Sequence, residues 1–507
     1  MIRRTRGAGL ISPLYFAAAM AAGLALRLYF IFHFPFSSGD TKFYEELARN
    51  WLDHGVYGLF VHGQLTSVDM RVPGYPAFLA AIYATLGRAR ETVRIIQAVL
   101  DLGTCWLTAL IAARIASPLA ARASDGSPGP PAQDGTDASQ ARCAATVALW
   151  LAALCPFTAN YTAVVMTEIL ATFLAMLAIL IFLRAVAHAE IDSTIPARDA
   201  RAKTAFRTAL NFLVCGGVIG LDTLVRPESP LLLIAALVFL GIHWRPRANW
   251  PKLALASAWM AAGLILVLTP WAARNASTLG RIEFLAPRYA QSNGDFIPRG
   301  LFAWTRTWMT RFDQAYLVPW KLGKAPIRIE TLPSSAFDSP EERSRVADLL
   351  AGYNHGWDMT PARDHQFAIL ARERTAHRPL RTYVFIPLAR AWMMWFTPRV
   401  ELLPYARDLW PPREKWRENP AAFLVTLGFG ILNFIYAGLA LVGVWRWRKN
   451  PAVEFLVLVL AVRTAFLTQL QTVEPRYLIV CFPAVLVLGA LAWFRPPAKT
   501  SKAREAA

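Results

Sequence analysis

The sequence predicts an all-α polytopic membrane protein, with a bundle of about ten transmembrane helices and an extracytoplasmic insert that lies along the membrane interface. Hydrophobic residues make up 55% of the 507-residue chain, and the mean hydropathy is +0.34. They are gathered in long runs rather than spread with the period of a soluble core. Arginines and lysines stand at the ends of these runs. The net charge of +19 therefore reflects the positive-inside bias and anionic lipid headgroups, and we expect no nucleic-acid partner.

Each transmembrane helix needs about 20 apolar residues, because a helix rises about 1.5 Å per residue and the hydrocarbon core is about 30 Å thick. The first run has a basic start but is too long for the apolar part of a signal peptide, so we expect it to remain as a span. The expected spans are residues 11–34, 93–115, 142–159, 163–187, 209–225, 229–244, 252–271, 422–445, 453–471 and 477–494.

Clusters of basic residues indicate the orientation. If the spans alternate in direction, nearly all clusters fall on one side, which is expected to be cytoplasmic. The clusters are Arg3, Arg4 and Arg6; Arg198, Arg201, Lys203 and Arg207; Arg245, Arg247 and Lys252; Arg446, Arg448 and Lys449; and Arg495, Lys499, Lys502 and Arg504.

Two apolar segments would reverse this orientation if they crossed the membrane. Residues 75–87 precede an outer cluster of Arg88, Arg90 and Arg94, but as a helix they reach only about 20 Å, too short to cross. Residues 380–396, if counted as a span, would put the basic residues at 446–449 outside. Both segments are therefore expected to be interfacial or re-entrant.

Three regions follow from this topology. Residues 1–275 form an N-terminal transmembrane module, with a first extracytoplasmic loop at 35–92. Residues 276–421 form an extracytoplasmic region near the headgroups, where its tryptophans are favoured, and residues 422–507 form the last helices and a cytoplasmic tail. The Ser-, Gly- and Pro-rich stretch 116–141 predicts a disordered cytoplasmic loop.

Capping signals mark two helix starts inside the extracytoplasmic region. Ser339-Pro340-Glu341-Glu342 has a capping serine, proline at the first helical position and glutamate at the third. Thr360-Pro361 begins in the same way. The five cysteines of the chain have no paired spacing, which excludes a disulfide framework and a cysteine metal site.

Acidic and arginine side chains from distant loops converge on the outer face of the expected bundle. Any one of them alone is as well explained by a charged residue at a helix end that reaches for the headgroups. Together they indicate a functional site, because charged groups near membrane helices are costly. They are Asp40, Arg71, Glu168, Arg226, Glu228, Arg274, Glu474 and Arg476.

Five stretches carry a resemblance to a known family. They are residues 37–76, with Gly39-Asp40 and Arg71-Val72-Pro73; residues 160–168; Val225-Arg226-Pro227; residues 270–275; and Glu474-Pro475-Arg476-Tyr477. Together they resemble the type C integral-membrane glycosyltransferases (GT-C). This superfamily uses polyprenyl-phosphate sugars and includes protein O-mannosyltransferases and lipid A aminoarabinose transferases. The resemblance spans Arg27 to Pro483 but leaves out the extracytoplasmic insert.

The resemblance implies that Asp40 is the catalytic carboxylate and that Glu168 occupies a second acidic position. Such a reaction needs a base for the acceptor proton and guanidinium groups for the leaving phosphate. Candidate phosphate ligands are Arg71, Arg226, Arg274 and Arg476. Candidate substrate-binding residues are Tyr44, Tyr75, Trp271, Asn275, Glu474 and Tyr477. No metal ligand is expected; a divalent metal ion remains an open alternative, and no other cofactor is indicated.

The implied activity is transfer of a sugar, a hexose or a pentose, from a polyprenyl-phosphate donor to an extracytoplasmic hydroxyl or amine, with inversion. The implied partners are that donor, a lipid-linked glycan, lipid or protein acceptor, and membrane lipids. The implied location is a bacterial cytoplasmic (inner) membrane, with the site facing the periplasm or exterior and a role in the cell envelope such as protein glycosylation. The alternatives are a polysaccharide polymerase or ligase, and a transporter or flippase of lipid-linked sugars.

Two departures put a protein or lipid A acceptor in doubt. Protein mannosyltransferases carry an Asp-Glu pair where this chain has Gly39-Asp40-Thr41, and their lumenal β-trefoil domain has no counterpart. Aminoarabinose transferases carry Lys-Pro-Pro where this chain has Arg71-Val72-Pro73. Three further charged residues lie in or near spans. Asp101 and Asp222 are expected to pair with neighbouring polar groups, and Arg27 either to reach the outer interface or to contact a lipid phosphate.

Overall fold

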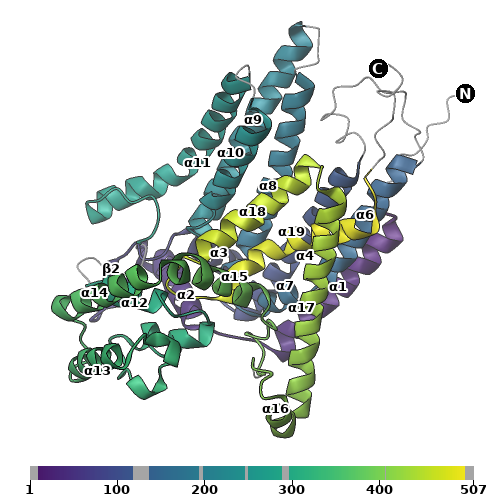
Figure 1. The fold of residues 1–507 in the computed structure, drawn as a ribbon. Helices are drawn as coiled ribbons and strands as arrows, with labels where there is room; N and C mark the ends of the chain where they lie inside the picture. Colours follow the sequence, from purple (N-terminus) through teal and green to yellow (C-terminus); the bar gives the residue numbers. More distant parts are fainter. Residues whose placement is uncertain are drawn as a thin grey trace, which may run out of the picture.

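The computed structural model describes residues 10–117, 136–192, 198–245, 249–287, 296–405 and 407–496. These residues form a helical bundle and an attached region of shorter helices, residues 296–405 and 407–418, which keeps the name extracytoplasmic region from its predicted location (Figure 1). The bundle helices are α1 (Pro13–His33), α4 (Arg90–Ala116), α6 (Thr136–Ala153), α8 (Glu168–Asp192), α9 (Arg198–Val225), α10 (Pro230–His243), α11 (Trp250–Leu279), α17 (Pro420–Trp447), α18 (Pro451–Leu467) and α19 (Phe482–Ala490).

Each of the ten expected spans contains a helix, and the chain is a multi-pass membrane protein. Within the described residues, seven helices are long and apolar enough to cross a membrane. An eighth span forms if Ala138–Ala153 and Pro156–Ala163, bent by 46°, count as one. Helices α10 and α18 have 14 and 17 residues. The expected number of ten therefore exceeds the seven or eight that reach full length.

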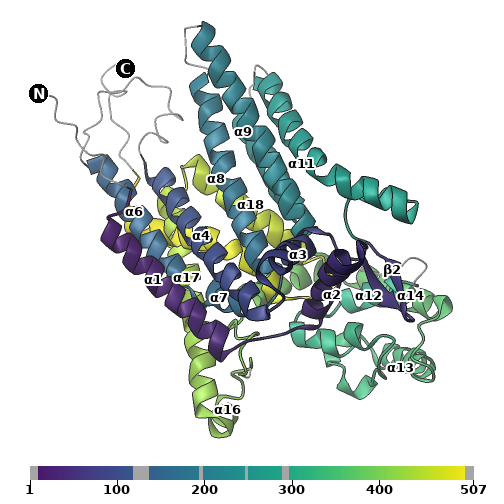
Figure 2. The ribbon, with the colours of Figure 1, turned by 180° about the vertical axis from the view of Figure 1, so that it is seen from behind.

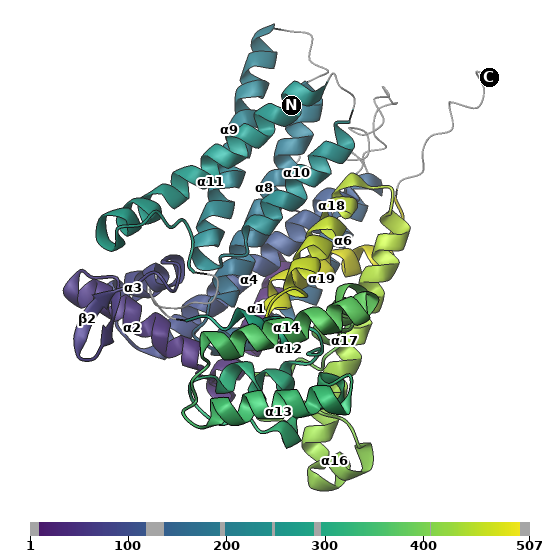
Figure 3. The same ribbon diagram turned by 60° about the vertical axis from the view of Figure 1, so that its left-hand side comes forward.

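The bundle has two distinct ends. The connections from α8 to α9, α10 to α11 and α17 to α18 lie at one end, and the extracytoplasmic elements gather at the other (Figures 1 and 3). The described basic residues next to these connections, Lys203, Arg207, Arg245, Lys252, Arg446, Arg448 and Lys449, belong to the first end. The positions of these connections thus agree with the prediction that successive spans alternate in direction.

Helices α9 and α11 approach each other closely because glycines face the contact. A Cβ atom at Gly216 would lie 2.0 Å from the carbonyl oxygen of Met260, and one at Gly263 would lie 2.1 Å from that of Leu213. Any side chain there would force the helices apart. Helix α11 continues to Leu279, past the region boundary predicted at residue 275.

The loop predicted to be the first extracytoplasmic one folds against the end of the bundle opposite the connections from α8 to α9, α10 to α11 and α17 to α18 (Figure 2). Helix α2 (Gly39–His54) starts with a capping box between Ser38 and Thr41. An antiparallel hairpin follows, β1 (Gly58–Val61) and β2 (Gln64–Ser67), whose two turn residues, His62 and Gly63, have φ angles of 51° and 80°. Positive φ at both positions matches the twist of a tight hairpin.

Both segments predicted to be interfacial form helices outside the long spans. Helix α3 (Gly74–Leu86) is a short apolar helix whose buried face packs on the bundle. In the second segment, a π-helical turn (Arg381–Phe385) leads into α15 (Ile386–Trp395). Leu388 and Trp392 on this helix are exposed, in keeping with a place at the interface.

The extracytoplasmic region has its own apolar core, formed around Trp304, Trp308 and Phe367. The two predicted helix starts are confirmed: Ser339 caps α13 (Pro340–Asn354) and Thr360 caps α14 (Pro361–His377). The remaining helices are α12 (Arg299–Arg306), α16 (Pro412–Glu418) and short 3₁₀ turns.

Two other expectations are corrected. The predicted disordered loop 116–141 is wrong for 136–141, since α6 begins at Thr136 and its alanines favour a helix; residues 118–135 lie outside the described residues. Arg27 neither reaches the interface nor is exposed, because it is buried in an ion pair with Asp101.

Candidate functional site

Asp40 is bridged by two arginines from distant parts of the chain. It lies in the first turn of α2, where the helix dipole favours an anion. Its Oδ1 is 3.2 Å from Nη2 of Arg71, and its Oδ2 is 3.1 Å from Nη2 of Arg476. The three side chains are 28%, 25% and 23% exposed, respectively. The cluster is therefore held together by charge and still accessible to a ligand.

The two guanidinium groups set the charge state of Asp40. Burial by itself raises the pKa of this carboxyl, but Arg476 and Arg71 outweigh burial and lower its pKa below the ordinary value of 3.8. A lowered pKa keeps Asp40 ionised at neutral pH, and it also makes the carboxylate a weaker base while both arginines stay in place.

We expect Arg71→Met to move the acid limb of the pH profile of kcat/KM, which is the range where activity falls as the essential base becomes protonated. The acid limb of kcat/KM reports the free enzyme's essential base. With Asp40 as that base, Arg71 helps to keep its pKa below the ordinary value, and loss of Arg71 would move the limb to higher pH because one of the charges that lowers the pKa is gone. Arg49→Met, at an exposed arginine of the same helix, should leave the limb in place. An unmoved limb in Arg71→Met would contradict the assignment of Asp40 as the base.

Glu168 belongs to a second, buried chain of charges. Its Oε1 is 3.1 Å from Nη1 of Arg226; Arg226 also binds Glu228 at 2.6 Å, and Arg463 binds Glu228 at 3.1 Å. Burial raises the pKa of Glu228, but Arg226 and Arg463 dominate and lower it to about 2. The guanidinium of Arg226 is thus already shared by two carboxylates.

One oxygen of Glu168 is left without a partner. Glu168 is 1% exposed, and its Oε2 has no hydrogen-bond partner among the described residues. An unsatisfied buried carboxylate oxygen costs about 1–3 kcal/mol or more. This oxygen is therefore suited to accept a hydrogen bond from a ligand.

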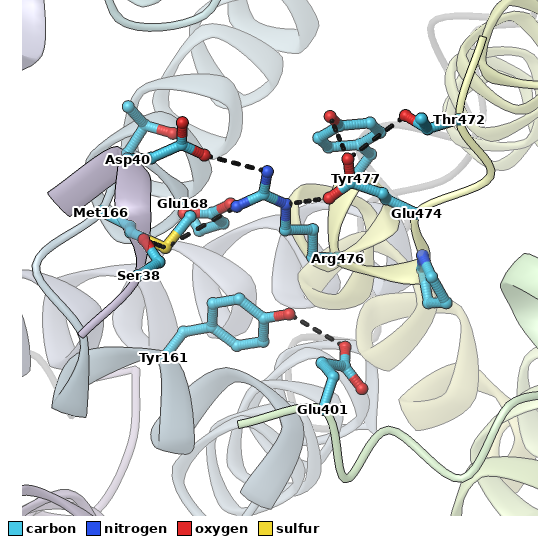
Figure 4. A network of polar contacts seen from close by, with 12 residues as sticks. Ser38, Asp40, Tyr161, Met166, Glu168, Glu401, Thr472, Glu474, Arg476 and Tyr477 are labelled. Carbon is cyan, nitrogen blue, oxygen red and sulfur yellow. Dashed lines mark hydrogen bonds and ion pairs between the residues drawn. The ribbon is translucent and has the colours of Figure 1, made fainter. Parts of the chain in front are cut away.

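Tyr477 and Glu474 link the two groups of charges (Figure 4). Glu474 binds Nε of Arg476 at 2.5 Å and accepts a hydrogen bond from the Tyr477 hydroxyl at 2.9 Å. The guanidinium carbons of Arg226 and Arg476 lie 5.3 and 5.4 Å from the centre of the Tyr477 ring, within cation–π range. The Asp40 cluster and the Glu168 chain therefore form one continuous site.

Arg274 does not join these charges. It donates to the backbone carbonyls of Val68 at 2.9 Å and Tyr57 at 2.7 Å, and its guanidinium lies over the rings of Tyr57 and Trp271. Asn275 donates to the carbonyl of Glu283. In the described contacts, Arg274 and Trp271 hold the hairpin loop beside α11, and Asn275 holds the segment that follows α11.

The two predicted tyrosines have different surroundings. Tyr44 lies one turn after Asp40, and burial raises its pKa to about 12, so it stays neutral and can donate a hydrogen bond. Tyr75 is fully buried and donates to Oε1 of Gln97 at 2.7 Å. Tyr75 therefore supports α3 against α4 from inside the core.

Sequence reasoning missed three residues at this site. Glu401, from the extracytoplasmic region, accepts a hydrogen bond from Tyr161, and Arg463 of α18 joins the buried chain of charges. Tyr161 lies in one of the stretches that carry the resemblance, which was a usable signal. Glu401 is flanked by no motif.

The described residues contain no group of three or more histidine, cysteine, aspartate or glutamate side chains that could hold a metal ion. All five cysteines are free thiols, as their spacing predicts.

Comparisons with known proteins give matches only among solved structures. No family model and no curated protein matches the chain. An Archaeoglobus fulgidus oligosaccharyltransferase in complex with Zn and sulfate has 14% identity and a TM-score of 0.44, over 94% of this chain and 48% of that one. The same enzyme tethered to an acceptor peptide with an NVT sequon has 13% identity and a TM-score of 0.46, over 94% of this chain and 49% of that one. ArnT from Cupriavidus metallidurans bound to undecaprenyl phosphate has 12% identity and a TM-score of 0.35, over 95% of this chain and 77% of that one. The chain spans about half the length of the oligosaccharyltransferase, and similarities at this level do not assign an activity.

Proposed function

We propose that the protein is a GT-C-type glycosyltransferase that moves a sugar from a polyprenyl-phosphate donor to an extracytoplasmic acceptor. The observation that carries this proposal is the bridging of Asp40 by Arg71 and Arg476 at the outer end of the bundle. A carboxylate next to accessible guanidinium groups supplies a base and a phosphate ligand at one place. The matching membrane is a bacterial cytoplasmic membrane, with the site facing outward.

The ion pairs of Asp40 suggest how binding and catalysis are coupled. The donor phosphate competes with Asp40 for Arg71 and Arg476, since phosphate is a good bidentate partner for guanidinium. Once the arginines turn to the phosphate, the carboxylate loses the charges that lower its pKa. Donor binding therefore makes Asp40 a stronger base.

The transfer step follows from this arrangement. The acceptor hydroxyl attacks C1 of the sugar on the face opposite the phosphate, and its proton passes to Asp40. The C1–O bond breaks, and its electron pair leaves with the phosphate oxygen, which the guanidinium groups stabilise. A single displacement of this kind inverts the configuration at C1. The unpartnered Oε2 of Glu168 is available to accept a hydrogen bond from a sugar hydroxyl.

A groove beside the site suits the lipid tail of the donor. It lies between α15 and α18, has a volume of about 570 Å³ and is almost entirely apolar. Its polar lining residues, Thr464, Thr468 and Gln469, stand at the end of α18 that leads to Glu474 and Arg476. This continuity favours the isoprenoid chain of the donor as the occupant, with its phosphate toward Arg476.

We expect Ala461→Trp to fill this groove and make the enzyme prefer short donors. The indole would displace the distal isoprene units, so KM should rise several-fold for an undecaprenyl-phosphate sugar and much less for an analogue with two or three isoprene units. Ala258→Trp, at an exposed position of α11, is the matched control. An equal rise in KM for short and long donors would show that the lipid tail does not bind in this groove.

The proposal itself is tested by incubating the purified protein with a panel of polyprenyl-phosphate hexoses and pentoses. Consumption of at least one donor, with release of the polyprenyl phosphate, is the expected result. A protein that is folded and consumes none of them would not be a glycosyltransferase of this class. The nature of the acceptor separates simple transfer from a polymerase or ligase, which would use the same site.

A further inference from the structure

A short segment of the extracytoplasmic region enters the bundle next to the site. Val400 and Leu403 are buried against Phe30 and Ile31 of α1 and Ala163. Residues 398–405 therefore belong to the wall of the site, although they come from the insert.

Arg399 fixes this segment in place. Its φ angle is 59°, a left-handed conformation that is unfavourable for residues other than glycine. The guanidinium is buried 4.3 Å from the Phe482 ring and donates to the carbonyls of Met394 at 2.8 Å and Pro475 at 3.3 Å. Pro475 immediately precedes Arg476, and Glu401 lies two residues after Arg399. The contacts of Arg399 therefore set the positions of both Arg476 and Glu401.

Glu401 has a neutral partner, unlike the other carboxylates of the site. Asp40, Glu168 and Glu474 are each paired with an arginine. Glu401 forms no direct ion pair with a described residue, although it interacts electrostatically with the buried Arg399; its Oε1 accepts the hydrogen bond of Tyr161 at 2.9 Å. Figure 4 shows this pair beside the Arg476 side chain, away from Glu474. Tyr161 is close enough to Glu168 and Arg476 to interact with them electrostatically.

This difference separates two halves of the site by chemistry. The carboxylates that are paired with arginines lie next to the guanidinium groups, which are suited to bind a phosphate. A carboxylate offers about four lone-pair positions, of which Tyr161 uses one, and Glu401 is only partly buried. Glu401 is therefore free to accept hydrogen bonds from a molecule that presents hydroxyl groups.

We propose that Glu401 is the acceptor-binding residue and that it takes a hydroxyl-bearing acceptor. This inference rests on the proposed glycosyltransferase function. Glu401 accepts a hydrogen bond from the acceptor and aligns its attacking hydroxyl, whose proton goes to Asp40. Tyr161 is a positioning residue, because its hydroxyl holds the Glu401 carboxylate in one orientation. The insert thus supplies acceptor recognition, and the membrane bundle supplies donor binding.

The test is a steady-state comparison of Glu401→Gln with the wild type. The donor is the polyprenyl-phosphate sugar that the wild type uses, and octyl glucoside serves as the hydroxyl acceptor probe. Hydrogen bonds to a charged group are worth about 1.5–3 kcal/mol, so we expect the acceptor KM to rise about 10-fold or more. The donor KM should stay within about twofold. Glu401→Asp should recover part of the loss, and Tyr161→Phe should raise the acceptor KM more weakly.

Glu330→Gln is the matched control, since Glu330 is exposed on the same extracytoplasmic region, and thermal unfolding of each purified variant checks its fold. An acceptor KM that is unchanged in Glu401→Gln, or a donor KM that rises equally, would overturn the inference and leave the proposed function intact. A wild type that transfers only to amines or water would overturn the hydroxyl class. A wild type that consumes no donor would overturn the proposed function, and this inference with it.

Discussion

Replacement of Asp40 by asparagine is expected to lower sugar transfer about 100-fold or more, the loss typical of a missing general base. Asparagine has nearly the same shape and still suits the first turn of a helix, so α2 should form normally. It cannot take a proton from the acceptor. The measurement is the single-turnover rate with a donor that the wild type consumes, at saturating donor and acceptor.

Asp53→Asn is the matched control for this experiment. Asp53 lies at the other end of α2, is exposed, and pairs with Arg88. Its replacement should leave the transfer rate unchanged, because it is remote from the arginines that surround Asp40. Transfer at close to the wild-type rate by Asp40→Asn would remove Asp40 from the mechanism.

Replacement of Asp101 by leucine is expected to give the largest loss of stability. Arg27 is completely buried; its Nη2 lies 2.6 Å from Oδ2 of Asp101, and its Nη1 donates to the carbonyls of Gly23 and Ala153. The pair therefore joins α1, α4 and α6. Removing one partner of a buried ion pair leaves an uncompensated charge and costs about 3–5 kcal/mol. The midpoint of thermal unfolding should fall accordingly.

The double variant Arg27→Leu/Asp101→Leu separates charge from packing. With both charges gone, no unpaired group remains, and leucine side chains suit a lipid-embedded core, so most of the lost stability should return. Asp313→Leu, which removes one partner of an exposed pair with Arg311, is the control and should have little effect. A double variant less stable than Asp101→Leu would show that the polar contacts of Arg27 with the backbone matter more than the charge balance.

The helices, and the gathering of the charged residues at one end of the bundle, could be predicted from sequence because physical constraints leave few alternatives. A long apolar run in a bilayer must bond its own backbone, which leaves a helix, and alternation of such helices places Asp40, Glu168, Arg226 and Arg476 at one end. The capping residues Ser339 and Thr360 acted locally and were equally readable. Helices α10 and α18 have only 14 and 17 residues, because their ends depend on packing against neighbouring elements.

The partners of each charged side chain could not be predicted. Arg274 looked equivalent to Arg476 in sequence, but it donates to the carbonyls of Val68 and Tyr57, which only the folded hairpin loop brings within reach. Glu401 gave no sequence signal, since its place depends on the buried contacts of Arg399 with residues far away in the chain. Long-range packing decides such pairings, and it leaves no local pattern.

If Asp40 and phosphate compete for the same two arginines, the affinity for polyprenyl phosphate must depend on the charge of residue 40. The measurement is the dissociation constant of undecaprenyl phosphate for the wild type, Asp40→Asn and Arg476→Gln, each in the same nanodiscs. We expect tighter binding by Asp40→Asn, because its arginines are no longer neutralised by a carboxylate, and weaker binding by Arg476→Gln. Equal or weaker binding by Asp40→Asn would contradict this competition.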